Sequence, residues 1–373
     1  MQFKDIIGQQ HAISQLISAV QTDRLPHAQI FLGPQGAGGL SLALAFAQFV
    51  LCTNPSESDS CGTCPACVKA SKYIHPDVHF SFPTVGSKMV STNFYQEWRT
   101  ALTANPYLNI NQWLQAINAE NKQGNITRDE CVSIVKKLSF KIFEGSHKVL
   151  IMWLPEFLGK EGNRLLKLIE EPPENTLFIL VAENQELILN TILSRCQILK
   201  VNKINDTDMI SLLQEKHQLS EADARRIAFL TNGNLNEAIM LIDSLETDNS
   251  GSFLKWFRLC FTGRPAEMLE WTREFSTLGR ENQKQFIRYG LNFLREYLIV
   301  KTTGNTNVRL QPNELATANK MTKVIAFHQI EQINSLLNDC YYYIERNANV
   351  KVLFLDASIQ LNKILKNKAY AKQ

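Results

Sequence analysis

Short, largely apolar runs alternate with amphipathic stretches over the first 200 residues of the chain. Four such runs occupy residues 28–32, 149–153, 177–181 and 197–201. The runs at 149–153 and 177–181 are uninterrupted, which is typical of strands buried on both faces of a parallel sheet. Helical periodicity lies between them, at residues 9–21, 40–51 and 162–171. Strands that alternate with helices predict a doubly wound α/β domain.

The remaining chain follows other patterns. Residues 80–125 lack a clear period, and a helix is predicted to begin after Thr127, with Val132, Val135 and Leu138 on one face. Beyond about residue 203 the pattern is helical throughout. The sequence therefore predicts an α/β domain followed by helical parts.

The loop after the first apolar run has most of a phosphate-binding motif. That motif, G-x-x-x-x-G-K-[ST], needs lysine for the phosphates and a hydroxyl for magnesium. Gly39 stands in place of the lysine, and Leu40 in place of the hydroxyl. The candidate nucleotide-contacting residues are the glycines Gly33, Gly36, Gly38 and Gly39. Their backbone N–H groups can still surround an anion, but without the lysine nucleotide binding is doubtful.

Four cysteines follow the helix after this loop with the spacing C-x8-C-x2-C-x2-C. They are Cys52, Cys61, Cys64 and Cys67. Four thiolates satisfy tetrahedral Zn²⁺ and leave no open position, so the spacing predicts a structural zinc site. An iron–sulfur cluster and four unrelated thiols are the alternatives. We expect the nearby His75 and His79 to be surface residues rather than ligands.

Composition and charge limit the class of protein. The 373 residues carry a formal net charge of +3, so any contact with nucleic acid would need a local basic patch. No run of 18 apolar residues is present, and the first residues lack the basic and apolar regions of a signal peptide. We therefore expect no membrane segment and a cytoplasmic location, where thiols stay reduced.

Several motifs occur together in one order along the chain. They are residues 3–9 (FKDIIGQ), residues 25–28 (LPHA), the degenerate loop, the four cysteines, His75-Pro76-Asp77, residues 163–173 (NRLLKLIEEPP) and Ser194-Arg195-Cys196. In this order they resemble the bacterial clamp loaders, AAA+ ATPase assemblies that open the sliding clamp of the replicative DNA polymerase. The resemblance covers residues 1 to about 245; further on it rests on length and on residues 346–349 (RNAN).

The resemblance implies that the catalytic groups for ATP hydrolysis are missing. The family's ATPases end the Walker B strand on Asp-Glu, which hold Mg²⁺ and orient the attacking water. Trp153 and Leu154 stand there in this chain, and neither ligates a hard cation. Asn236 stands where the sensor-2 arginine belongs. The chain thus resembles the delta-prime class, a part of the DNA polymerase III holoenzyme that is not an ATPase alone. A hydrolysing gamma/tau-type subunit is the alternative.

The Ser194-Arg195-Cys196 tripeptide carries the remaining catalytic expectation. In related clamp loaders the arginine of this motif reaches across the subunit interface to the neighbour's ATP. The resemblance therefore implies that Arg195, with Ser194, acts in trans on a neighbouring active site. A surface arginine in an ordinary salt bridge is the alternative.

The resemblance also implies domains and partners. We expect an AAA+ base at 1–202, a helical lid at 203–248 and a helical collar for oligomerisation at 249–373. The base would contain the zinc module at about 52–67 and an insertion at about 80–125. The implied partners are gamma/tau and delta subunits, the sliding clamp and, through the assembly, primer–template DNA. We expect Trp98 and Trp113 to anchor the insertion, although aromatic residues can also stack on single-stranded DNA. A zinc-dependent nucleic-acid-binding protein is a further rival.

Overall fold

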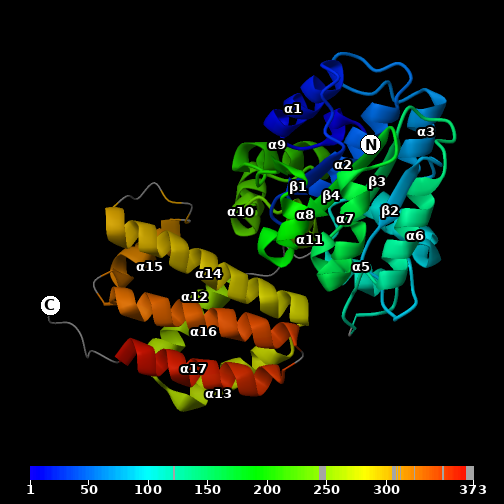
Figure 1. Cartoon of the computed structure of the whole chain (residues 1–373). Helices are drawn as coiled ribbons and strands as arrows, with labels where there is room; N and C mark the ends of the chain where they lie inside the picture. The colour runs from blue at the N-terminus through cyan, green and yellow to red at the C-terminus, as the bar shows by residue number, and fades with distance from the viewer. Residues whose placement is uncertain are drawn as a thin grey trace. The chain divides into compact units, whose positions relative to one another are not determined.

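A parallel sheet of five strands forms the centre of the N-terminal part of the chain in the computed structural model (Figure 1). The strand order is β2-β3-β4-β1-β5. The strands are β1 (Ala28–Leu32), β2 (Val78–Ser81), β3 (Lys148–Trp153), β4 (Thr176–Ala182) and β5 (Gln197–Lys200). All neighbouring strands are parallel, so the loops that follow them meet at one edge of the sheet, where open α/β sheets bind ligands.

The structure describes residues 1–366 apart from 121, 243–248, 305–307, 309, 311, 323 and 347. The chain divides into two units, Met1–Met240 and Leu241–Gln373. Residues 243–248, where we placed the end of the lid, lie outside the described residues, as does Asn347 of the expected C-terminal motif.

The sheet is covered on both faces at its central strands β3 and β4, as their uninterrupted apolar runs predicted, whereas the edge strand β5 is exposed at three of its four positions. Val149 and Ile151 of β3 pack into the cluster that contains α2 (Gly39–Leu51). Leu150 and Met152 point to the other face, into the cluster that contains residues of α6 (Arg128–Ser139). Because successive side chains of a strand alternate between faces, a strand covered on both sides is apolar at every position.

The predicted strands are confirmed to within one residue at each end. The strand β2 was missed, because its four residues include His79 and Ser81 and lack an apolar run. The predicted helix at 162–171 is only partly correct. Its first residues belong to a 3-10 segment, η3 (Pro155–Leu165), and only α7 (Leu166–Glu170) is α-helical.

The insertion at about 80–125, for which the sequence showed no clear period, contains three helical segments in its described residues. They are η2 (Ser91–Phe94), α4 (Tyr95–Ala104) and α5 (Ile110–Ala116). Trp98 and Trp113 are completely buried, and the ring centroids of Trp98 and Trp153 lie 5.3 Å apart. The prediction that both tryptophans anchor the insertion is confirmed. Since they are buried, they present no ring face to single-stranded DNA.

The helix α6 begins where the sequence predicted, but it buries a different face. The Thr127 hydroxyl accepts a hydrogen bond from the Glu130 N–H, as a helix N-cap does. Val132 and Val135 are exposed, contrary to expectation. The buried side chains of this helix are Glu130, Cys131, Ile134 and Leu138. Small differences in helix rotation decide between such neighbouring faces, and the sheet underneath selects one.

Helices complete the first unit. They are α1 (Gln10–Gln21), α3 (Pro65–Ser71), α8 (Asn190–Leu193), α9 (Asp206–His217), α10 (Glu221–Thr231) and α11 (Leu235–Ile242), of which residues 235–240 belong to this unit. The short 3-10 segments η1 (Phe3–Asp5) and η4 (Gln185–Leu187) complete the list. The N–H of Leu235 donates to the Gly36 carbonyl over 3.1 Å, which joins the start of α11 directly to the loop after β1.

The second unit consists of helices in its described residues. They are α12 (Asn249–Thr262), α13 (Pro265–Ser276), α14 (Arg280–Thr303), α15 (Pro312–Met321), α16 (Phe327–Glu345) and α17 (Val350–Lys366) (Figure 1). An aromatic core holds them together: Phe275 and Phe354 have ring centroids 4.2 Å apart, and the Trp256 indole donates to the Ser358 hydroxyl. Within the described part of the chain, no helix has the length and apolar character needed to cross a membrane.

Candidate functional site: a cysteine cluster and a degenerate nucleotide pocket

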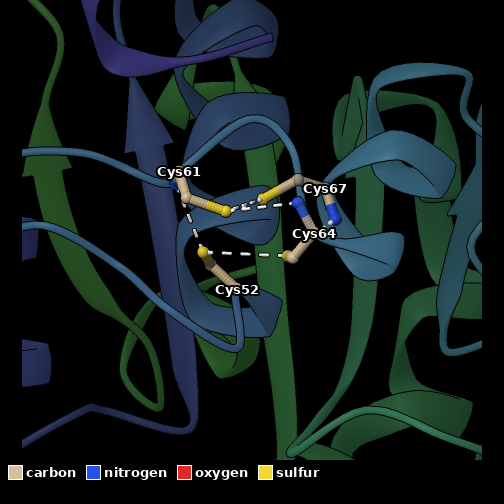
Figure 2. Close-up of side chains that lie close together, drawn as sticks. All are labelled: Cys52, Cys61, Cys64 and Cys67. Atoms are coloured by element: carbon tan, nitrogen blue, oxygen red, sulfur yellow. Dashed lines mark hydrogen bonds between the residues drawn. The ribbon is translucent and has the colours of Figure 1, made fainter.

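The four predicted cysteines converge between α2 and α3 (Figure 2). Cys52 follows the last residue of α2, Cys64 is the N-cap of α3, and Cys67 lies in the first turn of that helix. Pro65 occupies the first helical position, where its missing N–H costs nothing. The Cys67 N–H donates to the Cys64 sulfur over 3.4 Å, so a C-x2-C pair folds with both sulfurs on one side of the helix start.

The spacing of the sulfur atoms fits a tetrahedral metal site. All four Sγ atoms lie within 4.8 Å of one another. The Cys52–Cys64 and Cys61–Cys67 sulfur distances are 4.0 and 3.9 Å. Zinc–thiolate bonds of about 2.3 Å in a tetrahedron require sulfur atoms about 3.8 Å apart. The four cysteines therefore can hold a metal ion, and their chemistry and geometry are consistent with zinc.

The thiols differ in acidity because their surroundings differ. Burial raises the pKa of Cys52 and of Cys67, whereas the Cys64 N–H lowers the pKa of Cys61. Burial also opposes ionisation of Cys64, but hydrogen bonds from Thr53 and from the Cys67 N–H outweigh it and lower its pKa to about 6. Four thiolates this close repel one another unless a cation compensates their charge, which is what a bound metal supplies.

The predicted surface position of His75 is wrong. Its side chain is buried, and its Nδ1 accepts a hydrogen bond from the Asp77 N–H over 3.2 Å. It lies outside the cysteine cluster, as expected of a residue that is not a ligand. The Asp77 carboxylate accepts three backbone N–H groups, from Phe143, Glu144 and Gly145. His75-Pro76-Asp77 therefore forms a structural turn at the start of β2.

The loop after β1 has the backbone of a phosphate-binding loop. Gly33 follows the strand, Gly36 and Gly38 have φ of 72° and 96°, and Gly39 is the first residue of α2. Positive φ angles of this kind favour glycine. The predicted strand–loop–helix arrangement of these four glycines is thus present.

Protein side chains fill the space beside this loop. The remaining cavity has a volume of about 30 Å³, room for little more than water, whereas ligand pockets typically measure about 300–1,000 Å³. It is lined by Gly33, Pro34, Gly36, Gly38, Gly39, Leu40, Pro106, Tyr107, Leu108, Trp153, Val181, Ala182 and Glu183. Tyr107, Leu108 and Trp153 are all more than nine-tenths buried. The pocket in which a phosphate-binding loop would hold its ligand is therefore occupied by the protein itself.

The charge of this pocket is unsuited to phosphate. Its lining contains no lysine, arginine or histidine among the described residues, and Glu183 is the one carboxylate. Desolvation by the surrounding protein and the neighbouring Glu156 charge raise the pKa of Glu183 to about 7. The Glu156 carboxylate itself accepts hydrogen bonds from the N–H groups of Glu183 and Asn184. It is therefore engaged with the backbone after β4 instead of facing a metal.

The polypeptide also fills the positions at which catalytic groups are missing. Trp153 and Leu154, at the end of β3, are both buried. Asn236, at the expected sensor position, is fully buried, and its Oδ1 accepts a hydrogen bond of 2.7 Å from Asn105 Nδ2. These three residues pack as part of the protein core.

Arg195 lies on the surface after α8, apart from the cysteine cluster. Its guanidinium forms an ion pair with Glu170 and donates to the Thr191 carbonyl over 2.8 Å. It also donates to the Ser194 hydroxyl over 3.2 Å. About a third of the Arg195 side chain is exposed. The structure thus brings Ser194 and Arg195 together. In this chain Arg195 forms a surface ion pair with Glu170, which is the arrangement of the alternative interpretation.

Sequence reasoning missed Asn105 and Tyr107, the insertion residues that reach the pocket. The available signal was the Asn105-Pro106 dipeptide, which marks a turn between two short helices. That signal predicts a turn but does not say what the turn contacts, because the contacts join residues far apart in sequence.

Comparison with known proteins gives a consistent set of relatives. A family model described as "DNA polymerase III, delta subunit" matches residues 8–205. DNA polymerase III subunit tau of Bacillus subtilis is 27% identical over 259 residues, which is 68% of this chain and 39% of that protein. DNA polymerase III subunit delta' of the same organism is 27% identical over 228 residues, 61% of this chain and 56% of that protein.

These matches are partial. The chain spans less than two thirds of the length of either relative. Among solved structures, a gamma-subunit-related protein of Thermotoga maritima aligns with a TM-score of 0.37 and 15% identity, covering 94% of this chain and all of that one. A similarity at this level carries no argument about function.

Proposed function

The chain belongs to the protein family described as DNA polymerase III, delta subunit, and we propose that it is a delta-prime-type subunit of the bacterial clamp loader. In this role it helps to load the sliding clamp onto primed DNA without hydrolysing ATP itself. Its relatives include proteins named for the tau, gamma and delta' subunits, so membership of the family leaves the subunit type to be argued from the site.

The observation that carries the proposal is the filled pocket beside the degenerate loop. Hydrolysis needs a cation for the phosphates, oxygen ligands for Mg²⁺ and a space for the nucleotide. Gly39 stands in place of the lysine cation, and Trp153 stands in place of a metal ligand. The space available for a nucleotide is reduced to a cavity of about 30 Å³. One missing group can be compensated from elsewhere, but the loss of all three argues for the delta-prime type over the gamma/tau type.

Arg195 is the residue through which such a subunit would take part in catalysis. We assign it as an arginine finger for the ATP site of a neighbouring gamma/tau subunit, with Ser194 as the residue that positions it. The ion pair with Glu170 holds the side chain near the surface in the isolated chain. In the assembly the guanidinium would exchange this carboxylate for the neighbour's phosphate, which its planar fork also fits.

The remaining features fit the same role. Zinc in the Cys52–Cys64–Cys61–Cys67 site would be structural, because four thiolates leave no open coordination position. Residues 1–202 would form the AAA+ base, 203–248 the lid and 249–373 the oligomerising collar. Delta and gamma/tau subunits, the sliding clamp and primer–template DNA would be its partners in the cytoplasm.

The first test is nucleotide binding and turnover by the purified chain. A fluorescent ATP analogue is titrated with Mg²⁺, and phosphate release is followed in the same samples, with a hydrolysing gamma/tau subunit as the positive control. We expect neither saturable binding nor turnover. Mg²⁺-dependent turnover that co-purifies with the chain through successive columns would overturn the proposal and restore the gamma/tau alternative.

The second test places the chain in the assembled loader. Arg195→Ala is expected to lower DNA-stimulated ATP hydrolysis about tenfold or more, because arginine fingers contribute large factors to phosphoryl transfer. Arg195→Lys is expected to restore little. Arg164→Ala is the matched control, since Arg164 is also an exposed arginine in an ion pair, with Glu161. Equal activity of the Arg195→Ala and control assemblies would refute the assignment.

A further inference from the structure

The insertion between β2 and α6 reaches into the degenerate nucleotide site through the turn at residues 105–108, between α4 and α5. We propose that this turn is an internal ligand of the site. It takes the place of a nucleotide and ties α11 to the phosphate loop, so that the position of α11 is set without any bound molecule. The inference rests on the proposed function in one respect, that the site takes no nucleotide.

The turn contacts the loop after β1 directly. The Ser41 hydroxyl, in the first turn of α2, donates to the Pro106 carbonyl over 3.1 Å. A methyl group built at Gly38 would lie 2.9 Å from Cε1 of the Tyr107 ring, so a side chain at this position would require the ring to move. The bare backbone that admits phosphate in other loops of this kind therefore admits a tyrosine ring here.

The turn also contacts α11. Asn105 Nδ2 donates to Asn236 Oδ1 over 2.7 Å, and Asn105 Oδ1 accepts from the Tyr107 N–H over 2.9 Å. Asn236 is fully buried and Asn105 is half-buried, so this bond is partly shielded from water. The Asn105 side chain thus fixes the shape of the turn through its oxygen and binds the first turn of α11 through its nitrogen.

A direct contact between α11 and the loop completes the arrangement. The Leu235 N–H donates to the Gly36 carbonyl over 3.1 Å. A methyl group at Gly36 would lie 1.7 Å from Oδ1 of Asn234, so this glycine is needed for Asn234 to approach. Both positive-φ glycines of the loop therefore accommodate protein groups, one from the insertion and one from the residue preceding α11.

The turn is held in place by the buried aromatic rings behind it. The Trp113 indole donates to the Pro83 carbonyl over 2.7 Å, and Trp98 packs on Trp153 at the end of β3. Trp153, which stands where a metal ligand is expected, thus also supports the insertion through its contact with Trp98. Loss of the magnesium site and closure of the nucleotide site involve the same side chain.

Hydrogen–deuterium exchange on the full chain tests this inference. The variants are Asn105→Ala, which removes the bond to α11, and Tyr107→Ala, which empties the site. Asn111→Ala is the control, an exposed asparagine in the same insertion. In both test variants we expect amides 235–240 to exchange about tenfold faster or more, since one change removes the bond to the buried Asn236 and the other removes the buried Tyr107 ring. Amides of β3 should keep the rate of the unsubstituted chain, and the control should change neither.

The possible results separate the inference from the proposed function. Unchanged exchange at 235–240 in Asn105→Ala and Tyr107→Ala would overturn the inference, even if the chain still fails to bind ATP. If Tyr107→Ala also accelerates exchange in β3, the milder Asn105→Ala decides alone, by the same criterion. Saturable binding of the ATP analogue to the unsubstituted chain would instead overturn the proposed function.

Discussion

Replacement of Asp77 by alanine is expected to destabilise the first unit by about 3–5 kcal/mol at pH 7. Its carboxylate is 2% exposed and accepts N–H groups from Phe143 at 2.7 Å, Glu144 at 2.9 Å and Gly145 at 2.8 Å. Hydrogen bonds to a charged group contribute about 1.5–3 kcal/mol each. Three would sum to more than the predicted value, but they are not additive, and the turn can move to expose its N–H groups to water.

Asp77→Asn tests the charge separately from the shape. The amide keeps one oxygen, which can serve the Phe143 N–H, but its NH₂ group would face the N–H groups of Glu144 and Gly145. We therefore expect a loss of about 2–4 kcal/mol, close to that of alanine despite the conserved size. The control is Asp129→Asn, an exposed aspartate in the first turn of α6, for which we expect at most about 0.5 kcal/mol.

The assay is unfolding in urea, monitored through hydrogen exchange of the β3 amides, so that only the stability of the first unit is measured. The strand is a direct reporter, because the Val149 N–H donates to the Asp77 carbonyl. A loss below about 1 kcal/mol for both variants at pH 7 would refute the reasoning, since it would mean that the three bonds contribute no more than an exposed side chain.

The pH dependence supplies an independent check. Burial alone would raise the pKa of Asp77, but the three backbone N–H groups outweigh it and hold the pKa below the ordinary value of 3.8. A carboxyl group with a lowered native pKa stabilises the fold above its unfolded-state pKa and loses this effect as the pH falls through the native value. The difference between wild type and Asp77→Asn should therefore be constant from neutral pH to about pH 5 and shrink below about pH 4.

Three further predictions concern the metal site, the insertion and the pocket. Cys64→Ser is expected to abolish stoichiometric zinc binding, measured by elemental analysis, and to lower the melting temperature. The control Cys196→Ser, outside the cluster, should retain the metal. Zinc retained by Cys64→Ser would contradict the four-thiolate site. Trp98→Ala should cost about 3–5 kcal/mol in urea unfolding of the first unit, because it empties a fully buried aromatic site, and a cost under about 1 kcal/mol would mean that the insertion is not anchored there. Glu183→Gln should raise the melting temperature at pH 8 and leave it unchanged at pH 4, because a carboxyl whose native pKa is raised to about 7 destabilises the fold only above its unfolded-state pKa of about 4.5. The rise should be small, because the Glu183 side chain remains in contact with solvent. An equal change in melting temperature at both pH values would refute the charge argument.

The sequence alone determined the structural features that depend on residues close together in the chain. Four of the five strands were predicted from short, largely apolar runs; β3 and β4 are buried at every position, whereas the edge strand β5 is exposed at three of its four positions. The cysteine site was predicted because C-x2-C spacing places two sulfurs together within one turn of chain. The glycines predicted the backbone of the loop after β1, since positive φ is a local property.

Only the tertiary structure decided what those local features face. The same glycines suit a phosphate or a tyrosine ring, and residue types do not say that Tyr107, almost 70 positions further along the chain, lies against Gly38. The buried face of α6 was predicted wrongly because neighbouring elements choose among faces that the periodicity leaves nearly equivalent. His75 was predicted wrongly because its burial depends on the fold around the turn before β2. Local patterns thus determined which elements form, and the packing of distant segments determined that little space remains beside the loop after β1.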